Sequence, residues 1–253
     1  MSKSTIDWHH RFSQQAAWTK PLRDYLFSQV ELARAGRVLE VGCGTGVLLQ
    51  EIESLFGGDI FGLDIDPNHL AQASCHTIRS HLVHSDAHAL PFPNDSFDIT
   101  FCHFLLLWIK KPVQVLFEMS RITRPGGHVL ALAEPDYGGR IDYPFELERA
   151  GAWQQESLRR QGADPHIGRQ LAEVFTQAGL VDVQTGLLGG QWDSVYSGKT
   201  WASEWEVLEH DLKYLPQGWN RAQVDELKRI EEKARERGAR ILYVPTFYAW
   251  GKK

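Results

Sequence analysis

The fold of this 253-residue chain is decided by the stretch Val38-Leu39-Glu40-Val41-Gly42-Cys43-Gly44-Thr45-Gly46. Residues Arg37–Val41 read as a short apolar strand, and the glycines form a turn into a helical pattern that runs from Val47 to Leu55. Glycine at a strand-to-helix turn permits a positive φ and lets the backbone approach a ligand closely. The sequence therefore predicts a ligand-binding turn after the first strand.

The spacing of these glycines narrows the kind of ligand. The pattern GxGxG differs from the GxGxxG of dinucleotide enzymes and from the GxxxxGK[ST] of phosphate loops. No lysine follows the last glycine, which disfavours a triphosphate. Glu40 adds a negative charge just before the turn, and this charge repels a pyrophosphate but suits a cationic ligand.

Acidic residues follow the next two predicted strands. Asp64 ends a strand at Ile60–Leu63, and Asp86, with Ala87 after it, follows a strand at His81–Ser85. A carboxylate at such a position can accept both hydroxyl hydrogens of a ribose, and Asp86 can receive an exocyclic amino group such as that of adenine. Because the carboxyl ends of parallel strands meet in one crevice, these acids and the glycine turn are expected to bind a single nucleoside.

Strands and helices alternate up to residue 133. Two more strands are expected at Phe97–Leu106 and His128–Ala133, separated by a helix at Pro112–Ile122 and a turn at Pro125-Gly126-Gly127. Pro67 suits the first turn of the helix that follows the second strand. This alternation predicts an α/β fold with a parallel sheet wound by right-handed crossovers.

Four motifs in this order resemble those of the class I methyltransferases: VLEVGCGTG (38–46), GLDIDPNHL (62–70), DAHALPFPNDSFDIT (86–100) and RITRPGGHVLALAEP (121–135). The chain is most similar to the broad group of ubiquinone/menaquinone-biosynthesis C-methyltransferases. The resemblance covers residues 36–136 and is specific, because four ordered motifs agree.

The resemblance implies S-adenosyl-L-methionine as cofactor. It also implies a Rossmann-like, seven-stranded, mostly parallel sheet with helices on both faces and the last strand antiparallel. The family's cofactor-binding positions correspond to Glu40, Gly42, Cys43, Gly44, Gly46, Asp64, Ile65, Asp86 and Ala87, and His103 lies where relatives often approach the methionine end of the cofactor. Many relatives carry a His-His or His-Trp pair after the fourth strand. This chain has Leu107-Trp108 there, so base catalysis at that position is in doubt and the acceptor atom stays open.

The remaining sequence predicts a helical segment at 1–35, ended by Gly36, and a methyltransferase domain at 36–253. Helical lid elements are expected at about 140–165 and 190–238, over the carboxyl edge of the sheet. The individual elements expected after residue 136 are helices at Tyr143–Gln161, Ile167–Ala178, Gly198–Leu212 and Arg221–Arg237 and strands at Leu180–Leu188 and Ile241–Trp250. The aromatic residues Trp192, Trp201, Trp205 and Tyr214 in the second lid element suit an apolar or aromatic small molecule. Packing within the lid itself is the alternative.

Catalytic residues are not identified by any motif. Glu134 and Tyr137 leave the fifth strand at the carboxyl edge and are candidates to orient a substrate, the alternative being a glycine-held loop with exposed polar side chains. Trp18, with Trp8 and Phe12, is a candidate to close over the cofactor, the alternative being packing of an amphipathic helix. Methyl transfer from a sulfonium mainly requires alignment and exclusion of water, so the lack of a catalytic motif does not argue against it.

Composition disfavours several functions, although it leaves specific RNA methylation open. The net charge of -5 gives no reason to expect nucleic acid as a partner. No apolar run is long enough to span a membrane and no signal peptide is recognised. Three cysteines without CxxC spacing indicate a reducing, cytoplasmic setting, and the spacing of His76, His81, His84 and His88 matches no zinc site.

We therefore expect methyl transfer from S-adenosylmethionine to a small molecule. The alternatives are an S-adenosylmethionine-binding protein that does not methylate or is regulatory, and a nicotinamide-dependent oxidoreductase, which GxGxG and Glu40 disfavour. Substrate identity and oligomeric state are left open.

Overall fold

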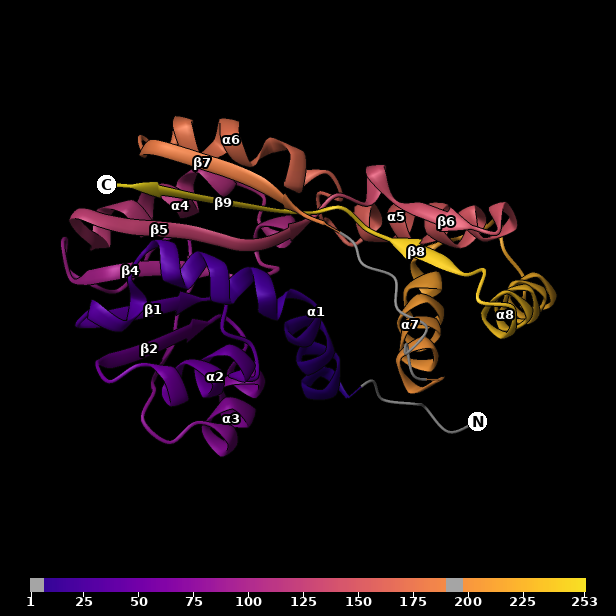
Figure 1. Cartoon of the computed structure of the whole chain (residues 1–253), viewed down its shortest axis with the longest axis horizontal. Coiled ribbons are helices and arrows are strands. Elements are labelled where there is room, and N and C mark those ends of the chain that lie inside the picture. The colour runs from indigo at the N-terminus through magenta and orange to yellow at the C-terminus, as the bar shows by residue number, and fades with distance from the viewer. Residues whose placement is uncertain (1–6, 190–197) are drawn as a thin grey trace.

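A computed structural model describes residues 7–189 and 198–253. Its main sheet has seven strands in the order β3-β2-β1-β4-β5-β9-β7 (Figure 1). These strands are β1 (Arg37–Val41), β2 (Asp59–Asp64), β3 (His81–His84), β4 (Phe97–Cys102), β5 (Thr123–Pro135), β7 (Val181–Leu188) and β9 (Thr246–Lys252). The first five pair in parallel, whereas β9 is antiparallel to both β5 and β7. The expected seven-stranded, mostly parallel sheet with its last strand antiparallel is confirmed.

Helices cover both faces of this sheet. One face packs against α1 (Trp8–Gln29), α2 (Val47–Leu55) and α3 (Pro67–His76), and the other against α4 (Pro112–Ile122) and α6 (Ile167–Gln177). Each face of the sheet has its own apolar core, and strand β1 contributes to both. Val38 faces α1 and α2, while Leu39 and Val41 face α4 and α6. A strand buried on both sides is continuously apolar, as this one is apart from Arg37 at its start and Glu40.

A separate group of elements, here called the cap, lies beyond the carboxyl end of β5 (Figure 1). It contains α5 (Glu148–Arg160), α7 (Gly198–Asp211), α8 (Arg221–Glu236) and a two-stranded sheet of β6 (Ile141–Tyr143) and β8 (Ile241–Tyr243). The cap has an apolar core of its own, which includes Leu147, Trp153, Leu208, Leu212 and Leu227. Residues 190–197 of the predicted lid element, and with them Trp192, lie outside the described residues.

Short 3-10 helices complete the structure: η1 (Leu32–Arg34), η2 (Leu106–Trp108), η3 (Tyr137–Gly139), η4 (Phe145–Leu147) and η5 (Leu212–Tyr214). Among the described helices, none is both long enough and apolar enough to cross a bilayer.

Several predicted boundaries were wrong. The first helix ends at Gln29 rather than near Gly36, because Glu31 adopts a left-handed conformation that no α-helix continues through. The strand predicted at Phe97–Leu106 ends at Cys102, and η2 follows it. The predicted helix at Tyr143–Gln161 begins only at Glu148.

The closing strand predicted at Ile241–Trp250 is split into β8 and β9. Pro245 lies between them and lacks a backbone N–H for a ladder bond, while its carbonyl accepts the N–H of Asp136 at 2.7 Å. The turn predicted at Pro125-Gly126-Gly127 lies inside β5, where the register with β4 shifts between Phe97 and Ile99.

Candidate active site

The glycine turn lies at the carboxyl end of β1 and requires its glycines. Gly42, Gly44 and Gly46 have φ angles of +76°, +51° and +80°, in the region that side chains other than glycine rarely adopt. A Cβ on Gly42 would lie 2.7 Å from Leu105 Cδ1. The backbone N–H of Gly42 donates to the carbonyl of Leu63 at 2.7 Å, which holds the turn against the end of β2.

Asp64 ties the tip of β2 to this turn. Its Oδ2 accepts the N–H of Gly44 at 2.7 Å, and its Oδ1 accepts the N–H of Asp66 at 2.9 Å. Burial alone raises the pKa of Asp64, but hydrogen bonds from His69, Asp66 and Gly44 outweigh burial and hold the pKa below its usual value. An ionised carboxylate therefore stands at the position predicted to bind ribose.

Glu40 is the one charged residue of β1 that is buried between sheet and helices. It is 3% exposed, and its Oε2 has no hydrogen-bond partner within the described part of the chain. Burial raises the pKa of Glu40 well above its usual value, and the charge of Arg23 partly opposes this rise. A buried polar atom without a hydrogen-bond partner is costly, which suggests that a ligand supplies the missing partner. A ligand with a cationic or hydrogen-bond-donating group fits it.

The other predicted cofactor residues lie at the same edge. Strands β2 and β3 pair in parallel with Asp64 opposite His84, which brings Asp86 close to the tip of β2. The Asp86 side chain is exposed and accepts the N–H of His88 at 2.9 Å, while Ile65 is 64% exposed and Ala87 is buried. His103 directly follows β4, beside the glycine turn, because Cys102 pairs with Val41.

Cys43 is buried beneath the turn. A Cβ on Gly62 would lie 3.0 Å from its Sγ, so the thiol fills the space between turn and β2. Burial raises the pKa of the Cys43 thiol, which keeps it protonated. These contacts indicate that its side chain packs and that its backbone forms the turn.

The first turns of α1 lie over the glycine turn. A Cβ on Gly44 would be 3.1 Å from the Phe12 ring, and His9 Nδ1 lies 2.9 Å from Thr45 Oγ1. Trp8 contacts Phe12 with ring centroids 5.9 Å apart. Trp18 is placed differently, since it packs beneath the guanidinium of Arg11, 4.9 Å from the ring centroid. Its predicted contact with the cofactor stays a prediction.

The strand-end position of Glu134 predicts a side chain that points into the crevice, but the structure does not show this. Its side chain is fully buried and accepts three backbone N–H groups, from Leu105 at 3.0 Å, Leu106 at 2.9 Å and Leu107 at 3.2 Å. Burial raises its pKa to about 7 although these three donors oppose the rise. Its carboxyl group therefore holds the start of η2, and we do not propose it as a catalytic group.

Tyr137 lies half-buried beside a contact between α1 and the cap. Arg11 Nη1 of α1 forms an ion pair with Glu204 Oε1 of α7 at 2.5 Å. Burial raises the pKa of the Tyr137 phenol; the charge of Arg11 lowers it and that of Glu204 raises it further. The phenol stays protonated at neutral pH, so it can donate a hydrogen bond to a substrate but cannot serve as a ready base.

Comparisons with known proteins agree with this geometry. A sequence profile described as "Methyltransferase domain" matches residues 39–131. Demethylmenaquinone methyltransferase of Bacillus licheniformis is 31% identical over 195 residues, which are 68% of this chain and 81% of that protein. The chain belongs to the class I S-adenosylmethionine-dependent methyltransferases.

Solved structures with the same fold include phosphoethanolamine N-methyltransferase 2 of Haemonchus contortus, which was solved with phosphomonomethylethanolamine and S-adenosylhomocysteine. It has a TM-score of 0.60 and 19% identity, and the match covers 95% of this chain but only 56% of that one. A putative sarcosine dimethylglycine methyltransferase of Galdieria sulphuraria has a TM-score of 0.57 and 15% identity, covering 94% of this chain and 86% of that one. At these identities the structures support the methyltransferase fold and nothing finer.

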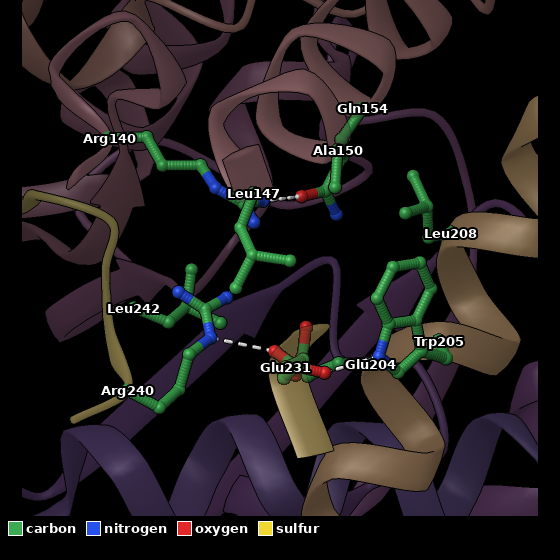
Figure 2. Close-up of a pocket in the computed structure, with 10 residues that line it drawn as sticks. All are labelled: Arg140, Leu147, Ala150, Gln154, Glu204, Trp205, Leu208, Glu231, Arg240 and Leu242. Carbon is green, nitrogen blue, oxygen red and sulfur yellow. Dashed lines mark hydrogen bonds and ion pairs between the residues drawn. The ribbon is translucent and has the colours of Figure 1, made fainter. Parts of the chain in front are cut away.

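The cap of this methyltransferase contains a cluster of ion pairs, of which Figure 2 shows the pair formed by Arg240 and Glu231. Asp142 accepts from Arg140 at 2.5 Å and from Arg240 at 2.8 Å, and Arg240 also pairs with Glu231 at 2.7 Å. Trp205 donates its indole N–H to Glu231. The space between them measures about 20 Å³, on the order of one water molecule. Trp205 therefore packs within the cap, which supports the alternative to an aromatic substrate lid.

No group of three or more potential metal ligands occurs among the described residues. Sequence reasoning missed Thr19, Arg23 and Glu204, which tertiary packing brings to the site. Only Arg23 carried a signal, because it lies next to Leu22 on the apolar side of α1, where an arginine needs a buried partner.

The contact of α1 with the glycine turn is expected to weaken in acid. His9 stacks on His76 with ring centroids 3.7 Å apart. Burial, and then the charge of His76, lower the pKa of His9 below 6.5; Asp7 and the bond to Thr45 oppose this, and His10 adds to it. As the pH falls below 6.5, His9 binds a proton more readily when α1 is undocked than when it is docked. Acid therefore lowers the stability of the docked form.

Limited proteolysis within residues 7–18 measures this effect. Cleavage of the wild type, relative to His9→Gln at the same pH, should accelerate between about pH 8 and about pH 5. The paired comparison cancels the pH dependence of the protease. A ratio that does not change with pH would contradict the prediction.

Proposed function

We propose that this methyltransferase transfers a methyl group from S-adenosylmethionine to a small-molecule acceptor held between the sheet edge and the cap. The single observation that carries the proposal is the group formed by the glycine turn, the ionised Asp64 and the unpartnered oxygen of Glu40. All three lie at one sheet edge, beneath the first turns of α1.

Each part of this group suits one part of the cofactor. Asp64 offers acceptor-only oxygens for the ribose hydroxyls, and Asp86 with Ala87 offers a carboxylate and an apolar surface for adenine. The free oxygen of Glu40 suits a donor or cationic group. When bound, the cofactor supplies an electrophilic methyl group on a sulfonium. The chain's own residues bind, orient and exclude water.

Three candidate bases among the described residues near this edge, His103, Tyr137 and Glu134, are poorly suited to that role. Burial and the charge of Arg23 lower the pKa of His103 to about 3, which leaves the ring neutral but a poor base. Tyr137 has a raised pKa, and Glu134 is occupied by backbone donors. Such a site favours an acceptor atom that is already nucleophilic at neutral pH. The names of the curated relative and of the structural neighbours differ in substrate, so the acceptor is proposed only as a small molecule.

Isothermal titration tests the cofactor assignment. S-adenosylmethionine and S-adenosylhomocysteine should both bind saturably, with a Kd below about 100 μM, or about -5.5 kcal/mol. NADH is the matched control and should give no heat of binding, since GxGxG does not suit a pyrophosphate. Binding of NADH, or no binding of either adenosyl ligand, would overturn the proposal.

A further inference from the structure

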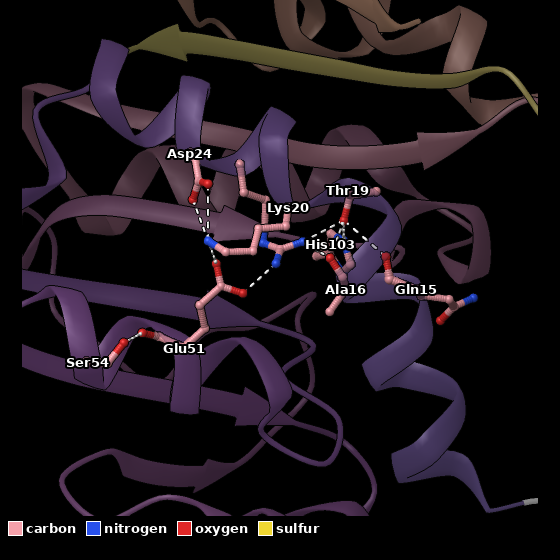
Figure 3. Close-up of polar contacts among 9 residues, drawn as sticks. Gln15, Ala16, Thr19, Lys20, Asp24, Glu51, Ser54 and His103 are labelled. Carbon is pink, nitrogen blue, oxygen red and sulfur yellow. Dashed lines mark hydrogen bonds and ion pairs between the residues drawn. The ribbon is translucent and has the colours of Figure 1, made fainter. Parts of the chain in front are cut away.

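A chain of buried polar contacts leads from α1 to His103 (Figure 3). Arg23 Nη1 donates to Thr19 Oγ1 at 2.6 Å, and Thr19 Oγ1 lies 2.9 Å from His103 Nε2. Arg23 also donates to the carbonyl of Ala16 at 2.5 Å and pairs with Glu51. Arg23 and Thr19 are each 1% exposed, so the contact between these two side chains is shielded from solvent.

The direction of each hydrogen bond follows from the donors available. A guanidinium can only donate, so Thr19 Oγ1 accepts from Arg23 and retains one hydrogen to donate. The carbonyls of Gln15 and Ala16 lie 3.2 and 3.3 Å from Oγ1, well beyond the roughly 2.7–2.8 Å of a good hydroxyl bond. His103 Nε2, at 2.9 Å, is the nearest acceptor. The hydroxyl points toward all three atoms, and its shortest contact favours donation to Nε2 over donation to the two helix carbonyls.

The state of the His103 ring follows from this contact. A neutral imidazole carries one proton, and with Nε2 accepting, that proton resides on Nδ1. Burial and the Arg23 charge favour the neutral ring. Nδ1 has no hydrogen-bond partner among the residues at 7–189 and 198–253. His103 thus has an N–H donor without a partner among the described residues, and its backbone follows β4 beside the glycine turn, since Cys102 pairs with Val41.

We propose that Thr19 and Arg23 are positioning residues that hold His103 in its Nδ1–H tautomer, so that Nδ1–H donates to the carboxylate of bound S-adenosylmethionine. The proposal rests on the proposed function, because it assumes the cofactor at this sheet edge. A carboxylate is the strongest hydrogen-bond acceptor that the cofactor carries, and a bond to it is charge-assisted. Because Thr19 and Arg23 belong to α1, the donor is set only while α1 is docked.

The tautomer is measured directly by long-range proton–nitrogen NMR on enzyme labelled at histidine nitrogens. The signal absent from the His103→Gln spectrum identifies His103. In the wild type and in Thr19→Ser, which keeps the hydroxyl, Nδ1 should carry the proton. In Thr19→Val, which replaces the hydroxyl by a methyl group, Nε2 should be protonated in part or in full. A wild-type ring protonated on Nε2, or a Thr19→Val ring identical to wild type, would overturn the proposal.

The acceptor of the Nδ1–H bond is identified by two ligands. S-adenosylhomocysteine carries the amino-acid carboxylate, whereas 5′-deoxy-5′-methylthioadenosine lacks it. Thr19→Val should weaken binding of the first by about tenfold relative to Thr19→Ser and leave binding of the second unchanged. Equal weakening of both would reduce Thr19 to a structural role.

The remaining outcomes are also decisive. Unchanged binding of both ligands, with the expected tautomer, would overturn the carboxylate as acceptor and point to an oxygen of the methyl acceptor. If neither ligand binds the wild type, the proposed function fails, while the NMR result still decides the tautomer by itself.

Discussion

Replacing Glu134 by alanine should lower the free energy of unfolding by about 3–5 kcal/mol, the largest effect expected for a single substitution near the site. The carboxylate is the acceptor for the backbone N–H groups of Leu105, Leu106 and Leu107, of which the last two belong to buried residues. Its removal leaves these donors without a partner and a cavity at the end of β5. Urea denaturation of the two proteins measures the difference.

Two further variants make the Glu134 experiment specific. Glu173→Ala removes an exposed carboxylate from α6 and should change stability by at most about 0.5 kcal/mol. Glu134→Gln retains the shape and one acceptor oxygen and should lose less than the alanine variant. A Glu134→Ala protein as stable as Glu173→Ala would show that the three bonds contribute nothing.

The raised pKa of Glu134 predicts that the free energy of unfolding depends on pH. Its folded pKa of about 7 lies above the usual 4.5, so between these values the folded protein binds a proton that the unfolded chain has lost. Stability contributed by Glu134 is therefore present below about pH 4.5 and is lost as the pH rises through 7. Relative to Glu134→Gln, the wild type should therefore lose stability as the pH rises from about 4.5 through 7, and the difference should change little at higher pH.

Replacing Asp64 by alanine should weaken binding of S-adenosylhomocysteine by roughly 1–3 kcal/mol, or about 5- to 150-fold in Kd. The ribose diol would lose its acceptor. In addition, the N–H groups of Gly44 and Asp66 would lose the oxygens that order the glycine turn. Isothermal titration gives both Kd values.

Asp59→Ala is a matched control, because Asp59 begins the same strand at its far end and is exposed. It should bind S-adenosylhomocysteine as the wild type does. Asp64→Asn, which keeps one acceptor oxygen, should fall between Asp64→Ala and the wild type. An unchanged Kd for Asp64→Ala would show that the ribose is bound elsewhere.

The sequence by itself determined the sheet, the glycine turn and the acids at its edge. These features depend on local signals: an apolar run buried on both faces at Arg37–Val41, glycines with positive φ after it, and Pro112 at the first turn of α4. Such signals act between residues near in sequence, so a one-dimensional pattern contains them. Strand β1 and helix α4 have the bounds that this pattern predicts.

Only the tertiary structure decided which partners the polar side chains at the site contact. Glu134 faces the backbone of Leu105–Leu107 across 27 to 29 positions, Thr19 meets His103 across 84, and Arg11 meets Glu204 across 193. Each buried polar group turns toward whichever partner the packing brings within reach, because leaving it without one costs about 1–3 kcal/mol. The identity of that partner depends on how α1, the sheet and the cap pack together, which no pattern of neighbouring residues specifies.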